Sequence, residues 1–230
     1  MNEEHIMVQI HDSILKGRFE TTCRQTETGK KIKPGVSELI EQSIQKKMSI
    51  PMISSDALDR AMDDSLEKFI SGEYNVPDLI MRAKYTYEAR EKLKEQAGVS
   101  DSLSKGKFIM ASIEGEYHRY GMDIVSSLLK GIGFNTIDLG MGVPVADIVR
   151  SVKDHRPDYL GISGSTFSTL PLIQELTDQL GQADCREDVT LILGGYLALT
   201  ESPESLGVDQ CCHNITETID LLKEFAGSAN

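Results

Sequence analysis

The sequence predicts an α/β protein in which a helical bundle precedes a five-stranded parallel sheet. Three observations support this fold class. Apolar residues recur at helical spacing in the first hundred residues, as at Ile6, Ile10 and Ile14. A short serine-rich segment, residues 99–106, then interrupts the pattern and is predicted to be a linker. Beyond it, short apolar runs alternate with amphipathic segments, which is typical of parallel strands covered by helices on both faces.

The helical domain is expected to span residues 1–98. Further apolar residues, among them Leu58 and Met62, fall on one face of a predicted helix. Two segments lack such a stripe. We expect residues 21–34 to form a loose connection or a frayed helix, and residues 49–55, which contain a proline, to interrupt the helices.

The sheet domain is expected to span residues 107–230. Its strands are predicted at 107–113, 134–139, 159–163, 189–193 and 208–212. The helices between and after them are predicted at 121–131, 144–155, 170–180 and 215–225. We expect the five strands to adopt a flavodoxin-like (Rossmann-like) order, in which the chain reverses direction across the sheet between the first and third strands.

The acidic composition argues against two classes of partner. A net charge of −12 at pH 7 does not suit binding to nucleic acid or to an anionic membrane, because both attract clustered cations. No apolar run is long enough to cross a bilayer, and the first residues lack the features of a signal peptide. Four cysteines without a Cys-x-x-Cys pair do not indicate a zinc site or a disulfide framework. We therefore expect a cytoplasmic protein with no nucleic-acid or membrane partner.

The carboxyl ends of the first, third and fourth strands are the expected place for a ligand, because parallel sheets bind ligands where the strand order reverses. The loop after the first strand, residues 114–121, is rich in ionisable groups. Residues 163–169, after the third strand, carry several hydroxyl groups, and residues 194–195, after the fourth, are both glycine.

His118, in the first of these loops, is a candidate metal ligand. A histidine can bind a metal through one ring nitrogen when an acceptor holds the other, and Glu116 lies two residues earlier. No further ligand is visible nearby, whereas a metal held by side chains alone needs three or four. One histidine is enough where a macrocycle supplies the other donors. The loops therefore predict a tetrapyrrole-like cofactor, with a slot for its polar appendage beside the hydroxyl groups.

Simpler interpretations of the same residues stay open. A single loop histidine can be an ordinary surface residue, the glycine pair can form a tight turn, and the hydroxyl groups can cap the third helix. Some residues have no comparable context and are expected to be solvated or structural: His5, His11, His155, His213, Cys211 and Cys212.

Several short motifs follow one another in a fixed order along the chain. They are Gly72-Glu73-Tyr74-Asn75-Val76-Pro77-Asp78-Leu79, Glu116-Tyr117-His118-Arg119-Tyr120-Gly121, Gly133-Phe134, Asp138-Leu139-Gly140, Val143-Pro144, the residues from Ser163 to Thr169, and Gly194-Gly195. From about residue 10 onward, this series resembles the cobalamin-binding family that includes the corrinoid proteins of methyltransferase systems and the cobalamin domain of methionine synthase.

The resemblance implies a cobalamin cofactor and a role for each motif. His118 is expected to be the lower axial ligand of the cobalt, in place of the cofactor's own base, and Glu116 its hydrogen-bonding partner. The helical bundle is expected to act as a cap domain. Further cofactor contacts are expected from Tyr117, Arg119, Gly121, Ser163, Ser165, Phe167, Thr169, Gly194 and Gly195.

The resemblance implies that the chain carries a methyl group on the cobalt of its cofactor. The partners would be a substrate-specific methyltransferase and a second methyltransferase that serves the acceptor. The chain would then be a corrinoid subunit of a methyltransferase system rather than a stand-alone enzyme, without a catalytic residue of its own. The resemblance names neither the methyl donor nor the acceptor.

Departures from the family motifs motivate an alternative function. Glu116 replaces an aspartate, Ser165 and Phe167 change the lining of the slot, and Asn75 stands where the cap carries an aromatic residue. The alternative is a non-catalytic cobalamin carrier or sensor.

Two other classes of α/β protein are disfavoured. A phospho-acceptor receiver needs an aspartate at the end of the third strand, where Ser163 stands, and a dinucleotide-binding enzyme needs Gly-x-Gly-x-x-Gly after the first.

Overall fold

The chain forms two compact units. The computed structural model describes residues 2–26, 29–97 and 104–228. The units are Met1–Leu103 with Lys130–Gly133, and Ser104–Leu129 with Phe134–Asn230. Residues 99–103 of the linker expected at 99–106 lie outside the described residues.

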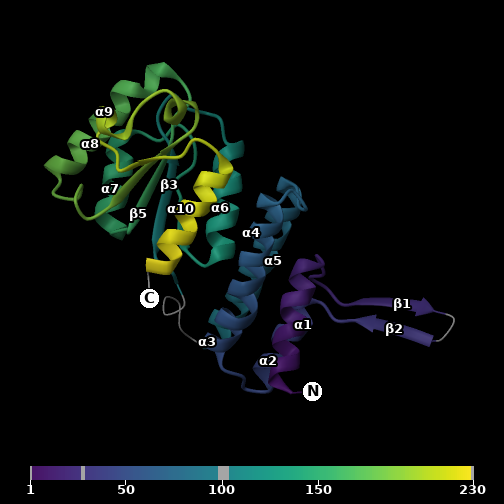
Figure 1. Ribbon diagram of the computed structural model, residues 1–230. Coiled ribbons are helices and arrows are strands. Elements are labelled where there is room, and N and C mark those ends of the chain that lie inside the picture. The colour runs from purple at the N-terminus through teal and green to yellow at the C-terminus, as the bar shows by residue number, and fades with distance from the viewer. Residues whose placement is uncertain (1, 27–28, 98–103, 229–230) are drawn as a thin grey trace. The chain divides into compact units, whose positions relative to one another are not determined.

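The first unit contains a helical bundle (Figure 1). Its helices are α1 (Glu3–Leu15), α2 (Val36–Gln45), α3 (Ile50–Ile53), the π-helix η1 (Ser54–Asp59), α4 (Arg60–Ile70) and α5 (Val76–Ala97). Ile6, Ile10 and Ile14 of α1 are fully buried, as their four-residue spacing predicts, and pack with Leu39 and Leu58 of the other helices.

Residues 21–34 form a β-hairpin, so both of our interpretations of this segment are wrong. Strands β1 (Thr22–Thr26) and β2 (Gly29–Lys33) pair in antiparallel fashion, from Thr22 opposite Lys33 to Thr26 opposite Gly29. The two strands satisfy the backbone hydrogen-bonding groups of each other, which a polar segment can do without an apolar stripe. The periodicity of the sequence therefore gave no signal.

The interruption expected at residues 49–55 lies earlier, at residues 46–49, and residues 50–55 are helical. The chain runs through α3 and η1 directly into α4. Pro51 lies in the first turn of α3, where the backbone N–H that proline lacks would have no partner within the helix. A proline at this position starts a helix rather than ending one.

Asn75 caps the start of α5. Its Oδ1 accepts a hydrogen bond from the backbone N–H of Asp78 at 2.9 Å, and the Asp78 carboxylate accepts one from the Asn75 N–H at 3.3 Å. This reciprocal arrangement satisfies two of the N–H groups that a helix start leaves free. The asparagine thus has a structural role at this position.

The second unit is built on a five-stranded parallel sheet, in agreement with the predicted fold class. The strands are β3 (Lys107–Ser112), β4 (Asn135–Asp138), β5 (Tyr159–Ser163), β6 (Thr190–Gly194) and β7 (Gln210–Cys211). Their order is β4-β3-β5-β6-β7, and every described pair is parallel. The order reverses between β3 and β5, which are the first and third strands of the sheet.

Helices cover both faces of this sheet. They are α6 (Tyr120–Ile132), α7 (Val145–His155), α8 (Leu170–Gln182) and α10 (Ile215–Ser228), with the short α9 (Pro203–Leu206) and the 3₁₀-helices η2 (Phe167–Thr169) and η3 (Tyr196–Leu199). Figure 1 shows α6 and α10 on one side of the strands and α7 and α8 on the other.

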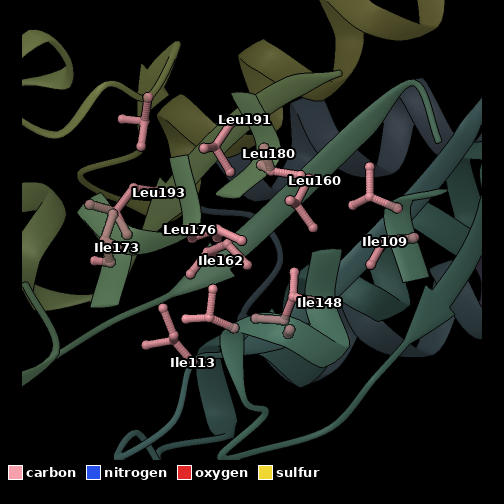
Figure 2. Close-up of a cluster of buried hydrophobic side chains, with 14 of the residues drawn as sticks. Ile109, Ile113, Ile148, Leu160, Ile162, Ile173, Leu176, Leu180, Leu191 and Leu193 are labelled. Carbon is pink, nitrogen blue, oxygen red and sulfur yellow. The ribbon is translucent and has the colours of Figure 1, made fainter. Parts of the chain in front are cut away.

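The strands separate a packed core from a less filled face, because successive side chains point to opposite faces. Ile109, Leu160 and Leu191 are fully buried and belong to a core cluster with residues of α7 and α8 (Figure 2). Their neighbours Phe108 and Gly161 lie on the opposite face, toward α6 and α10. The alternation therefore gives one face large aliphatic side chains and the other face a mixture that includes glycine.

Candidate functional site

A cavity of about 460 Å³ lies in the second unit, on the face of the sheet that α6 and α10 cover. Its walls come from β3, β5 and β6 on one side and from the two helices on the other. The loops at the carboxyl ends of the strands contribute His118, Ser165 and Gly195 to its lining. The cavity thus lies at the reversal of the strand order, where the sequence predicts the ligand site.

Small residues keep this cavity open. Gly161, Ser163 and Gly194 stand on the cavity face of β5 and β6. A Cβ atom added to Gly161 would lie 2.9 Å from Cε1 of Phe108, so this glycine makes room for the ring. A Cβ atom added to Gly194 would lie no closer than 4.0 Å to its nearest neighbour, the carbonyl oxygen of Ile162. The space beside Gly194 is therefore empty because the residue has no side chain.

Glu116 holds the imidazole of His118 in place. The Glu116 side chain is fully buried, and its Oε1 lies 2.6 Å from Nδ1 and 2.8 Å from the backbone nitrogen of His118. Its Oε2 accepts a hydrogen bond from the backbone N–H of Ser165 at 2.5 Å. An ionised carboxylate can only accept, so Nδ1 carries a proton, and in the neutral imidazole this leaves the lone pair on Nε2. The His118 ring itself is 77% exposed.

Glu116 is ionised in the folded protein. Burial by itself would raise the pKa of this carboxyl, but the hydrogen bonds from His118 and Ser165 stabilise the charged form. The balance lowers the pKa of Glu116 below its ordinary value. The carboxylate therefore stays charged at neutral pH and fixes the histidine tautomer that leaves Nε2 available to a metal.

Exposed apolar side chains surround the site. They come from the loops at the carboxyl ends of the strands and are Tyr117, Tyr120, Met141, Phe167, Tyr196 and Leu199, with between 45% and 88% of their surface exposed. Phe167 and Tyr196 pack edge to face, with 6.2 Å between their ring centres. Contiguous exposed apolar surface is typical of a binding site. These residues offer apolar surface to a broad, flat ligand.

The structure brings most of the predicted site residues to the cavity. His118, Gly121, Ser163, Ser165, Gly194 and Gly195 line it. Tyr117 and Phe167 belong to the exposed apolar residues around it. Thr169 does not line the cavity. It is buried, and its hydroxyl donates to the carbonyl oxygen of Thr166.

Arg119 binds two carboxylates rather than lining the cavity. Its Nε donates to Asp123 at 2.7 Å and one terminal nitrogen donates to Asp138 at 2.6 Å. These carboxylates raise the pKa of the Arg119 guanidinium. Because Asp138 ends β4, the ion pairs tie the loop that carries His118 to the neighbouring strand.

The sequence analysis missed a second set of lining residues. Cys212, His213 and Asn214 stand between β7 and α10 and line the cavity. We expected His213 to be solvated or structural because it has no motif around it. The sequence feature that could have identified His213 is its position in a loop that follows a strand, because His118 also lies in such a loop.

A family model described as a B12 binding domain matches residues 106–222, which is just over half of the chain of 230 residues. The chain belongs to the B12-binding family. This confirms the family that the motifs resemble and makes cobalamin the cofactor.

Known proteins agree with membership of the B12-binding family. The chain is 25% identical over 227 residues to dimethylamine corrinoid protein 1 of Methanosarcina acetivorans, covering 98% of this chain and 99% of that protein. Its fold is similar to that of a cobalamin-binding protein from Desulfitobacterium hafniense DCB-2, with a TM-score of 0.70, 24% identity and 98% coverage of both chains. It is also similar to a chain of the methanol:cobalamin methyltransferase complex MtaBC from Methanosarcina barkeri, with a TM-score of 0.76, 20% identity and coverage of 99% and 81%.

The residues present fit the cofactor of the B12-binding family. Within the described part of the chain, no three or more His, Cys, Asp or Glu side chains gather where they could hold a metal ion. One free imidazole nitrogen is nevertheless a sufficient donor for a cobalt whose macrocycle supplies the others. The cavity beside Gly194 offers room for the nucleotide tail, and the exposed apolar residues offer a surface for the macrocycle.

Charge on Glu116 should stabilise the fold of this B12-binding unit. Because its pKa is lowered, the carboxylate contributes stability at pH values above its ordinary pKa of 4.5 and loses that contribution as the pH falls through the lower folded value. Glu116→Gln places an amide NH₂ against a hydrogen-bond donor. We expect a loss of about 1–3 kcal/mol in the free energy of unfolding in urea at neutral pH.

This loss should shrink in acid, as the pH falls below the ordinary pKa of 4.5 and the wild-type carboxyl takes up a proton. Glu187→Gln changes an exposed glutamate and serves as the control. A Glu116→Gln effect that is the same at neutral and at acid pH would contradict the role of the charge.

Proposed function

We propose that the chain carries a methyl group on cobalamin between a substrate-specific methyltransferase and a second methyltransferase that serves the acceptor. One observation carries the proposal: Glu116 holds His118 so that a free ring nitrogen stands at the mouth of a cavity at the reversal of the sheet. The similarity to a corrinoid protein over nearly the whole chain supports the same function.

In this proposal His118 is the lower axial ligand and Glu116 the group that keeps a proton on Nδ1. Bound cobalt supplies the nucleophile for methyl transfer. The protein positions that cofactor and surrounds it with apolar side chains, which limits the access of water. The cavity between the sheet and the helices α6 and α10 takes the nucleotide tail.

The proposal of methyltransferase partners is based on the ionisable groups that line the cavity. The described residues that line the cavity include His118, His213 and Cys212 as their ionisable groups, and His118 is assigned to the cobalt. This set does not provide a site for activating a methyl donor. Donor activation and acceptor binding therefore fall to partner proteins, and the chain acts as the carrier between them.

The alternative function, a cobalamin carrier or sensor without methyl transfer, rests chiefly on Asn75. Its side chain is engaged in capping α5, which gives this polar residue a purpose unrelated to the cofactor. Because the capping of α5 explains the asparagine, Asn75 gives less support to a carrier or sensor function. A transfer assay separates the two functions directly.

Removing the imidazole should change the ligation of the cobalt. With His118→Ala, we expect bound cobalamin to lose the absorption spectrum of histidine-ligated cobalt while the far-UV circular dichroism stays that of the wild type. The control is His155→Ala, since this exposed histidine lies at the end of α7. An unchanged spectrum in His118→Ala, or cobalt ligated by its own benzimidazole in the wild type, would contradict the assignment.

Filling the cavity should exclude the nucleotide tail. In Gly194→Val, the new side chain enters open space, so we expect normal folding but an affinity for cobalamin lower by about tenfold or more. Cobinamide lacks the nucleotide and should bind as it does to the wild type. Gly181→Val, in an open position on α8, is the control. Equal cobalamin affinity in Gly194→Val and wild type would place the tail elsewhere.

Methyl transfer itself can be measured with the whole chain. Purified protein is loaded with cobalamin, reduced, and offered dimethylamine, trimethylamine or methanol together with candidate methyltransferases from the same organism. We expect the absorption band of methylated cobalamin to appear with one pair and to decay when an acceptor methyltransferase and its thiol or folate are added. Stable binding without methylation in every pair would favour the carrier or sensor.

A further inference from the structure

A second histidine–carboxylate pair lines the same cavity. His213 lies two residues after the end of β7, and its Nδ1 is 2.6 Å from Oε2 of Glu217. The pair formed by His118 and Glu116 has the same distance between the same kinds of atom. Like Nε2 of His118, Nε2 of His213 has no hydrogen-bond partner among the described residues. The cavity therefore has two imidazoles, each held by a carboxylate.

The capping of α10 accounts for the side chains of Glu217 and Asn214 but not for the imidazole of His213. Asn214 accepts from the backbone N–H of Glu217 at 3.0 Å, and its amide donates to the Glu217 carboxylate at 2.9 Å. The Glu217 carboxylate also accepts from the backbone N–H of His213 at 3.1 Å. This is a helix cap built from backbone groups and two side chains. Any residue except proline could supply the backbone N–H at position 213, so the cap does not require a histidine ring.

The ring contact nevertheless has an electrostatic consequence. The pKa of Glu217 is lowered, chiefly by its hydrogen bond with the His213 side chain. The His213 side chain is 49% exposed, so it stands at the mouth of the cavity, within reach of a ligand that enters.

His213 is also distinctive for its charge. Neither lysine nor arginine is among the described residues that line the cavity. Burial raises the pKa of the Cys212 thiol, which keeps that group neutral. With His118 assigned to the cobalt, His213 is the lining group that can become a cation. The chain as a whole carries a net charge of −12, which disfavours an anion near its surface.

We propose that His213 binds the phosphodiester of the nucleotide tail and makes the cavity selective for a corrinoid that retains this phosphate. The inference rests on the proposed function, because it assumes that the tail enters this cavity. A phosphodiester is an anion, and it needs a donor or a cation when it moves from water to a partly buried site. In its protonated form, His213 carries a proton on Nε2 as well as on Nδ1, so Nε2 can donate a charge-assisted hydrogen bond to the phosphodiester.

The test compares three corrinoids with the full-length chain. Cobalamin carries the whole nucleotide, cobinamide phosphate carries phosphate without the base, and cobinamide carries neither. Dissociation constants are measured by absorbance titration for the wild type, His213→Ala and His213→Gln. The matched control is His155→Ala, which removes an exposed histidine that does not line the cavity.

We expect His213→Ala to weaken cobalamin and cobinamide phosphate by about tenfold each and to leave cobinamide unchanged, because loss of one charge-assisted hydrogen bond has about this effect. Glutamine can donate a hydrogen bond but carries no charge, so His213→Gln should show a smaller loss for the same two ligands. His155→Ala should match the wild type for all three.

Two results would overturn the inference. An equal loss for all three corrinoids would mean that His213 serves only the structure of the loop, and no loss for any of them would mean that the phosphate lies elsewhere. Failure of the proposed function has a different signature. In that case the wild-type chain would bind none of the three corrinoids, or His118→Ala would leave the spectrum of bound cobalamin unchanged.

Discussion

The buried carboxylate of Glu116 organises the site. Its two oxygens accept from the ring and backbone of His118 and from the backbone of Ser165, so that it joins the loops that follow β3 and β5. A buried charge is stable only when hydrogen bonds replace its lost hydration, and here three donors do so. The position of the imidazole, its tautomer and the spacing of the two loops therefore depend on a single side chain.

The two faces of the sheet carry different side chains, and this difference makes the arrangement possible. On one face, Leu160 and Leu191 pack into a core with α7 and α8 that gives the unit its rigidity. On the other face, Gly161 makes room for the ring of Phe108 and Gly194 leaves open space in the cavity. Successive side chains of each strand point to opposite faces of the sheet. The same strand therefore packs the core with one set of side chains and lines the cavity with the other. A ligand can then enter the sheet domain without disturbing its main core.

Much of this architecture follows from local sequence. The strand at Tyr159–Ser163 has the predicted bounds because an apolar run there lies between polar and glycine residues. The loop with His118 was found because a charged segment follows a strand at the reversal of the sheet. The strands at 22–26 and 29–33 were missed because their sequence has no apolar stripe and their structure depends on backbone pairing. His213 was missed for a different reason: its importance comes from the cavity that it shares with His118, and only the folded chain shows which loops share a cavity.

The hydrogen bond that joins Glu116 to the loop after β5 comes from the main chain of residue 165, and the Ser165 side chain further lowers the pKa of Glu116. Nineteen of the twenty amino acids could donate it, and proline alone could not, because proline has no backbone N–H. A change of side chain at position 165 therefore keeps this main-chain hydrogen bond but loses the stabilisation that the serine side chain gives to the Glu116 charge. Because Ser165 also lines the cavity, the wall can change at this point while the two loops stay joined.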